Sequence, residues 1–167
     1  PAQIRNSNAY QLEAQVSDLG ALPVIVTTAR DDVANLGDVL DSALTSAHVV
    51  LFSGGVSMGD FDLVPGVLKS RGFRLQFEKV RIQPGKPTVF ATAHRKSVFG
   101  LPGNPVSTYV IFELLAKPHL LALMGHAHRP LIVNAALFET FTRKVATRKA
   151  WVPVRFTEDG RVARVDY

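Results

Sequence analysis

The stretch HVVLFSGGVSMGDFD occupies residues 48–62 and joins an apolar run to a glycine-rich turn. His48–Phe52 reads as a buried central strand, and the tight turn begins at Ser53-Gly54-Gly55. Leu63–Ser70 then has the pattern of a short helix that stops near Gly72. A glycine-rich turn between a strand and a helix is typical of the carboxyl edge of a parallel α/β sheet, where ligands bind. The stretch therefore predicts an α/β fold with a candidate site at one edge of its sheet.

Helical and strand-like patterns also alternate upstream of this stretch. Asn6 or Ser7 is suited to cap a helix whose apolar positions recur at helical spacing and which stops at Gly20. Leu22–Thr27 (LPVIVT) reads as a buried strand, and Asp32 is suited to cap a second helix.

The alternation continues downstream as far as residue 126. Arg74–Val80, Thr88–Ala93 and Ser97–Leu101 read as strands, the last two forming a hairpin through the polar turn His94-Arg95-Lys96. Val106–Leu115 is a strongly apolar helix, which Pro118 kinks or restarts and Gly125 ends. We therefore predict one α/β domain over residues 1–126, with a largely parallel sheet and helices on both faces.

The remainder of the chain, residues 129–167, has a different pattern. Strand-like runs lie at Ile132–Phe138, Trp151–Phe156 and Arg161–Tyr167, with Glu158-Asp159-Gly160 as a hairpin turn between the last two. Two or three strands bury too little surface to be stable alone. We interpret this part as the start of a small β-domain that needs a partner surface.

Composition excludes several classes of function. The 167 residues contain no cysteine, so a disulfide framework, a thiolate metal site and a cysteine nucleophile are all absent. The five histidines are scattered, which argues against a histidine metal site. No signal peptide and no apolar run near the length of a bilayer span is evident, so we expect a cytoplasmic protein that does not enter a membrane.

The net charge of +5 is not concentrated in one dense basic run. The nearest approach to a cluster comprises Arg143, Lys144, Arg148 and Lys149. A solvated basic face explains it more simply than nucleic-acid binding, which we do not expect.

The glycine-rich turn is a candidate anion site. Its glycines permit close backbone approach, and Ser53 and Ser57 add hydroxyl donors near a helix N-terminus. Asp60 and Asp62 repel a bare phosphate, which suggests Mg²⁺ or a polar heterocycle in addition, and Asp31 is placed to join Asp62 at the same edge. A simple glycine turn with capping carboxylates remains an alternative interpretation.

Two further segments are candidates for ligand contact. Lys79, Arg81 and Lys86 surround a proline-stiffened turn, and alternation along a strand places Lys79 and Arg81 on the same side, where they could clamp a phosphate or an oxyanion. Gly100–Ser107 is a stiff loop with two prolines that suits the wall of a site for a ring-shaped ligand. A solvated basic edge strand and a plain turn before a helix are the simpler alternatives.

Taken together, these segments resemble the molybdopterin molybdenumtransferase family, known as MoeA in bacteria and similar to the E domain of gephyrin. The motifs Asn6-Ser7-Asn8, Arg30-Asp31-Asp32, Ser53–Asp62, Pro84-Gly85-Lys86-Pro87 and Gly100–Ser107 follow the order and spacing of that family. The resemblance covers nearly the whole chain, and the pair SGGVSMGDFD and GLPGNPVS is highly specific.

The resemblance implies a three-layer α/β/α molybdopterin-binding fold, similar to MoaB and Mog proteins, followed by the start of the family's C-terminal β-domain. It also implies an enzyme that inserts molybdenum from molybdate into adenylylated molybdopterin and releases AMP. Mg²⁺ is the implied cofactor, and a homodimer is implied for full-length members.

The resemblance also assigns roles to individual residues. Asp31, Asp62 and Lys79 match catalytic positions, and the two carboxylates match the metal site. The expected substrate-binding residues are Ser53, Gly54, Gly55, Ser57, Gly59, Asp60, Lys86, Pro102, Gly103, Asn104, Pro105 and Ser107.

The chain departs from the family pattern at several points. His48 stands where the family commonly has Asp, and Gln83 stands where many members have Lys. The family's preceding domains and a Thr-Gly-Asp-Glu-Leu segment are not in this sequence, so we expect these 167 residues alone to bind molybdopterin weakly and to insert no molybdenum. Two alternative functions remain, namely molybdopterin adenylyltransferase on the same fold and a non-catalytic molybdopterin-binding or scaffold module.

Overall fold

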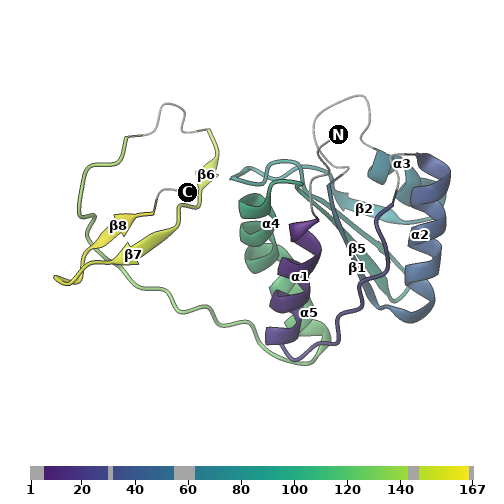
Figure 1. Cartoon of the computed structure of the whole chain (residues 1–167), viewed down its shortest axis with the longest axis horizontal. Helices are drawn as coiled ribbons and strands as arrows, with labels where there is room; N and C mark the ends of the chain where they lie inside the picture. Colours follow the sequence, from purple (N-terminus) through teal and green to yellow (C-terminus); the bar gives the residue numbers. More distant parts are fainter. Residues whose placement is uncertain (1–5, 30–31, 55–62, 143–146, 166–167) are drawn as a thin grey trace.

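A four-stranded mixed sheet forms the centre of the protein, which we describe from a computed structural model (Figure 1). The structure describes residues 6–29, 32–54, 63–142 and 147–165. The strands are β1 (Val49–Ser53), β5 (Lys96–Leu101), β4 (Val89–Ala93) and β2 (Arg74–Phe77), in that spatial order. β1 runs parallel to β5, whereas β4 is antiparallel to both β5 and β2.

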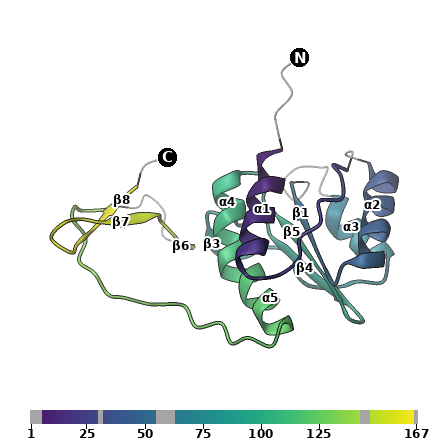
Figure 2. The same ribbon diagram turned by 60° about the horizontal axis from the view of Figure 1, so that its bottom comes forward.

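Helices cover both faces of this sheet (Figure 2). One face carries α1 (Ser7–Asp18) and a continuous helical segment made of α4 (Pro105–Ile111), the π-helical turn η1 (Phe112–Ala116) and α5 (Lys117–Leu123). The other face carries α2 (Val33–Ser46) and α3 (Leu63–Ser70). Each face buries its own apolar cluster, one centred on Leu40 and Val98 and the other on Phe99 and Phe112. The predicted three-layer α/β/α fold is confirmed.

Capping side chains fix where the helices begin, as the sequence predicts. The Asn6 side chain accepts a hydrogen bond from the Ala9 amide at 3.2 Å, and Asp32 accepts one from the Asn35 amide at 2.7 Å. Gly20, Gly72 and Gly125 follow helices with φ of 81°, 76° and 82° respectively, which are dihedrals that glycine adopts without strain. The predicted β4–β5 hairpin is also confirmed, with Ala93 opposite Lys96.

The prediction of a buried strand over Leu22–Thr27 is wrong. The segment is irregular, and the side chains of Leu22 and Val24 are 95% and 74% exposed. An apolar run reveals a preference for extended backbone but not the existence of a neighbour. Within the described residues no strand pairs with it.

Three further expectations about the sheet need correction. β1 was predicted to be central but is the outer strand of the described sheet, and the expected parallel core is reduced to the single pair β1–β5. The strand predicted over Arg74–Val80 ends at Phe77, because its register with β4 shifts between Leu75 and Phe77 and pairing then stops.

The C-terminal segment forms strands, as predicted, but shorter ones and not all at the predicted places. They are β6 (Lys149–Ala150), β7 (Val154–Phe156) and β8 (Val162–Arg164), and β7 and β8 form the predicted hairpin with Gly160 at φ 79°. Ile132–Phe138 is not a strand, and its only ladder contact in the described residues is a bridge between Leu137 and Val162. The hairpin lies away from the α/β unit in Figure 1, and β6 returns to it by pairing with β3 (Ile82–Gln83).

The helical segment Pro105–Leu123 is long and apolar enough to cross a membrane, judged only by its 19 residues and mean hydropathy of 1.3. From the sequence we expect no apolar run near the length of a bilayer span, and that expectation underestimates the length of this apolar helix. Its Ile111, Phe112 and Ala116 are completely buried against the sheet, which is the pattern of a core helix.

His119 on α5 is a titratable group within this core layer. Its Nε2 lies 2.8 Å from the Ser97 hydroxyl, and its ring contacts Phe90 and Phe99 edge-on at centroid distances of 5.2 and 5.5 Å. Burial lowers the pKa of His119 below its ordinary value of 6.5.

We predict a histidine-dependent loss of stability in mild acid. The unfolded chain takes up the proton at a higher pH than the folded protein, so the free energy of unfolding falls as pH decreases through 6.5 toward the lowered pKa. Denaturant titrations between neutral and acidic pH should show a smaller slope for His119→Gln than for wild type. His126→Gln, at an exposed position beyond α5, is the control, and an unchanged slope for His119→Gln would contradict the prediction.

Candidate functional site

The sheet register brings four chain segments to one edge. Ser53 at the end of β1 pairs with Leu101 at the end of β5, and Val89 at the start of β4 pairs with Gly100. β2 ends at Phe77, opposite Phe90 near the start of β4. The residues that follow β1, β5 and β2 and those that precede β4 therefore lie along the same edge.

Helix N-termini gather at this edge too. α2 leads into the start of β1 and α3 leads back to the start of β2, so both helices begin at the edge where β1 ends. α4 begins directly after β5, and α1 begins where Asn8 contacts the loop after β5. Helix N-termini present backbone N–H groups and a partial positive charge, which favours anionic ligand groups.

The turn after β1 packs against the loop after β5, as the sequence analysis expects. Gly54 has φ 90°, and its amide donates to the Leu101 carbonyl at 3.1 Å. A Cβ placed on Gly103 would lie 3.6 Å from the Gly54 Cα, so the two glycine backbones are adjacent. The side-chain amide of Asn8 donates to the Gly103 carbonyl at 2.9 Å and connects α1 to the same point.

Side-chain hydrogen bonds hold the loop after β5 in one shape. Asn104 caps α4 by accepting from the amides of Val106 and Ser107 at 3.0 and 3.2 Å. The Thr108 hydroxyl donates to the Pro102 carbonyl at 2.5 Å from inside the core. Pro105 occupies the first turn of α4, where a missing N–H costs nothing. The loop is thus a rigid wall that leaves Gly103, Asn104 and Pro105 exposed at the edge.

The turn before β4 is anchored just as firmly. Gly85 has φ 111°, and a Cβ there would lie 2.3 Å from Ile111 Cγ1, so only glycine fits between the turn and α4. The buried Thr88 hydroxyl donates to the Gly85 carbonyl at 2.7 Å, and the Val80 amide donates to the Lys86 carbonyl at 3.0 Å. Val80 follows Lys79 in the chain, so the bond from Val80 to Lys86 brings Lys79 and Lys86 close together along the backbone.

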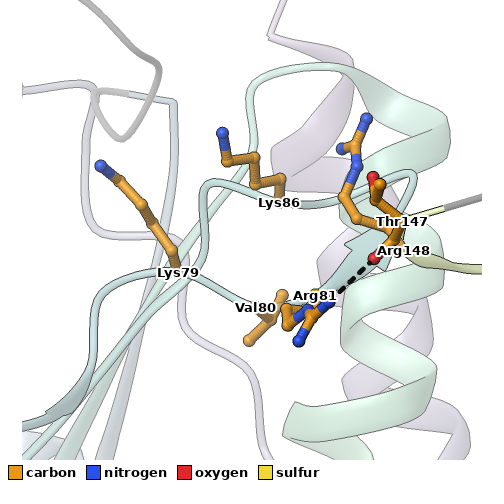
Figure 3. A pocket seen from close by; sticks show the side chains of 6 residues that line it. All are labelled: Lys79, Val80, Arg81, Lys86, Thr147 and Arg148. Atoms are coloured by element: carbon orange, nitrogen blue, oxygen red, sulfur yellow. Dashed lines mark hydrogen bonds between the residues drawn. The ribbon is translucent and has the colours of Figure 1, made fainter. Parts of the chain in front are cut away.

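A pocket of about 440 Å³ lies over this turn (Figure 3). Four cationic side chains contribute to its lining, which consists of Lys79, Val80, Arg81, Lys86, Thr147 and Arg148. In Figure 3, Lys79 and Lys86 extend toward the same side, whereas Arg81 lies beside Thr147 and donates from Nη2 to its carbonyl at 3.3 Å. The expectation that Lys79 and Arg81 share a strand face is therefore wrong, because the strand has already ended. The three cations are nevertheless brought to one pocket.

Thr147 and Arg148 come from the C-terminal segment, and sequence reasoning did not assign them to the site. Parallel pairing of β3 with β6 aligns Ile82 with Lys149, and the Trp151 amide donates to the Gln83 carbonyl at 2.8 Å. The interpretation of Arg148 as part of a solvated basic face needs correction, since the side chain is partly buried and lines the pocket. Two-residue strands that pair across more than 60 positions leave no recognisable signal in sequence.

The described residues account for part of the expected site. Among the substrate-binding candidates, Ser53, Gly54, Pro102, Gly103, Asn104, Pro105 and Ser107 lie in the two adjacent segments at the sheet edge, and Lys86 lies in the pocket. The remaining candidates fall outside the described residues, namely Asp31, Gly55, Ser57, Gly59, Asp60 and Asp62. Asp32 lies beside that group and is used as the cap of α2.

No group of three or more histidine, aspartate or glutamate side chains with metal-binding spacing occurs among the described residues. The pocket over the turn before β4 is cationic. Such a site fits a phosphorylated or oxyanionic ligand.

Comparison with known proteins identifies the family. Residues 1–122 match the family described as "probable molybdopterin binding domain". The chain belongs to the molybdopterin-binding domain family.

Relatives of this molybdopterin-binding domain carry the name of an enzyme. The chain is 38% identical over 144 residues to the molybdopterin molybdenumtransferase of Staphylococcus epidermidis, and 38% identical over 147 residues to molybdopterin molybdenumtransferase 2 of Mycobacterium tuberculosis. These matches cover 86% and 82% of this chain but only 34% and 36% of the relatives. The chain thus spans about a third of their length.

Solved structures place the domain in the same fold. The molybdopterin biosynthesis moea protein from Pyrococcus horikosii matches the whole chain and 40% of its own length, with a TM-score of 0.83 and 30% identity. Molybdenum cofactor biosynthesis protein B matches 75% of the chain with a TM-score of 0.57 and 13% identity, which shows a shared fold alone. The predicted resemblance is confirmed.

We predict that Gly85→Ala destabilises the molybdopterin-binding domain by about 1–3 kcal/mol, because a Cβ there collides with Ile111 and φ is positive. Gly66→Ala is the matched control, since Gly66 lies within α3 with open space around the missing Cβ, and alanine favours helix. Urea denaturation should show a lower midpoint for the first variant and an equal or higher one for the second. Equal midpoints for Gly85→Ala and wild type would show that the turn is not tightly packed.

Proposed function

We propose that the protein acts in molybdenum cofactor biosynthesis as a molybdopterin molybdenumtransferase, inserting molybdenum from molybdate into adenylylated molybdopterin with release of AMP. The observation that carries the proposal is the convergence of the Ser53–Gly54 turn, the Pro102–Ser107 loop and the Lys79–Lys86 pocket at one sheet edge. The names of its relatives support the same reaction.

The chemistry of this edge suits both substrates. A pterin is flat and polar, and the rigid loop after β5 supplies exposed backbone groups against which such a ring can lie. The phosphates of an adenylylated substrate and the molybdate dianion are matched by Lys79, Arg81, Lys86 and Arg148 and by the helix N-termini. Positioning two anionic reactants beside one another requires such a concentration of positive charge, because they repel each other in its absence.

We assign Mg²⁺ to Asp31 and Asp62, as the resemblance implies. The described residues provide no competing carboxylate cluster, and both proposed ligands lie outside them. Bound there, the ion would neutralise substrate phosphate charge. Lys79 is the proposed basic residue beside the reacting groups, and it extends into the pocket with Lys86 (Figure 3).

The adenylyltransferase alternative shares the fold but is less well supported. The structural match to molybdenum cofactor biosynthesis protein B is weaker than that to the Pyrococcus moea protein, with TM-scores of 0.57 and 0.83. The C-terminal strands that contribute Arg148 to the pocket also match the latter protein, whose similarity covers the whole chain. We further propose a cytoplasmic location, homodimer formation by the full-length protein, and no nucleic-acid or membrane partner.

We predict that Lys86→Ala weakens binding of molybdate and AMP to the domain by about tenfold, because each charged hydrogen bond to an anion contributes roughly 1.5–3 kcal/mol. Lys86→Arg should retain most of the affinity. Arg95→Ala removes the same charge from the hairpin turn at the opposite end of the sheet and should leave binding unchanged. Calorimetric titrations at two ionic strengths measure this, and an equal loss in the Arg95 variant would indicate a diffuse charge effect.

The reaction itself is testable in a chimera in which these 167 residues replace the corresponding segment of the Staphylococcus epidermidis relative. We expect molybdate-dependent AMP release from adenylylated molybdopterin and Mg²⁺. Asp62→Asn should reduce that release by at least tenfold while leaving pterin binding nearly unchanged, because Asn keeps the shape but removes the charge proposed to hold Mg²⁺. ATP-dependent adenylylation of molybdopterin by the chimera would instead favour the alternative enzyme.

A further inference from the structure

Asn8 is a buried polar residue at the candidate site whose bonding is incomplete. It lies in the first turn of α1, and only 7% of its surface is exposed. Its Nδ2 donates to the Gly103 carbonyl at 2.9 Å. Its Oδ1 is buried and has no hydrogen-bond partner among the described residues.

The hydrogen bond to Gly103 fixes which end of the amide is which. The Gly103 carbonyl can only accept, so the amide nitrogen must face it, and the oxygen is the atom left without a partner. A buried acceptor that lacks a donor is costly and uncommon in folded proteins. The bond to Gly103 accounts for Nδ2, whereas nothing among the described residues accounts for Oδ1.

The position of Asn8 suggests what Oδ1 binds. Gly103 packs on Gly54, so the Asn8 amide reaches the point where the two predicted substrate-binding segments meet. Gln11, one turn later on α1, also contacts this loop: its Nε2 donates to the Pro105 carbonyl at 3.3 Å and to Gln15 Oε1 at 3.4 Å, but its side chain is only partly buried. Asn8 alone combines contact with Gly103 and a spare buried acceptor among the described residues of α1.

We propose that Asn8 is a specificity-determining residue for the pterin. Nδ2 holds the Gly103 carbonyl and so positions the loop, and Oδ1 accepts a hydrogen bond from the 2-amino group of the bound ring. This inference rests on the proposed function, since it assumes that a pterin binds at this edge. The amino-substituted edge of a pterin is rich in N–H donors, whereas a lumazine carries a carbonyl in place of the amino group. Facing Oδ1, that carbonyl would set two acceptors against each other.

The test compares pterin-6-carboxylate with lumazine-6-carboxylate by fluorescence titration of the 167-residue chain and its variants. Wild type should bind the pterin about fivefold more tightly, the effect of one neutral hydrogen bond. Asn8→Ala should bind both compounds equally. Asn8→Asp keeps the acceptor and loses the donor to Gly103, so it should bind both more weakly but still prefer the pterin.

Gln11→Ala is the matched control and should keep the wild-type preference, because it loses the bonds to Pro105 and Gln15 but leaves the Asn8 amide in place. Asn8→Ser serves if Asn8→Ala does not fold, as judged by circular dichroism. A preference retained in the folded Ala or Ser variant, or no preference in wild type, would overturn the role of Asn8 while leaving pterin binding intact. Binding of neither compound by wild type would overturn this inference together with the proposed function.

Discussion

The position of β5 between β1 and β4 is the constraint on which the site depends. All residues of β5 from Ser97 to Leu101 are buried, so the strand is held by ladders on both sides and by apolar layers on both faces. Its side chains alternate between the two clusters, with Val98 in one and Phe99 and Leu101 in the other. A slip of one residue would exchange these faces, so the register is strongly specified. The ends of β1 and β5 are therefore fixed relative to each other, and the two loops that follow them are kept adjacent.

Above that edge, the loops are rigid because interior groups bind their backbones. Thr108 holds Pro102, Thr88 holds Gly85, and Ile111 occupies the space that a side chain at Gly85 would need. The same helix thus supports both the wall of the predicted pterin site and the turn that carries Lys86. A pterin and an anion bound at these two places would be positioned by one packed layer, so their separation would vary little. Such preorganisation lowers the entropic cost of bringing two reactants together.

The sequence predicted most of what local signals can encode. The caps at Asn6 and Asp32, the hairpin at His94 and the helix over Leu63–Ser70 all depend on neighbouring residues, and the structure confirms them. Errors arose where pairing is long-range. Leu22–Thr27 has the composition of a strand but lacks a neighbour in the described residues, and nothing local marks the pairing of β3 with β6. Arg148 was consequently assigned to the surface. Asn8 formed part of a recognised motif, yet its orphan oxygen became visible only through its burial and its contact with Gly103.

Placing the cations on two different parts of the chain has an energetic consequence. Lys79 and Lys86 belong to the α/β domain, whereas Arg148 is brought to them by a two-residue strand pairing and by the hydrogen bond from Arg81 to Thr147. An anion placed among these cations would interact favourably with both parts of the chain at once. If an anion binds in the pocket, as the proposed function requires, it would stabilise the docked arrangement to the extent of its differential affinity for that arrangement. The C-terminal strands bury little apolar surface of their own, so on the proposed function a bound substrate anion would contribute part of their stability.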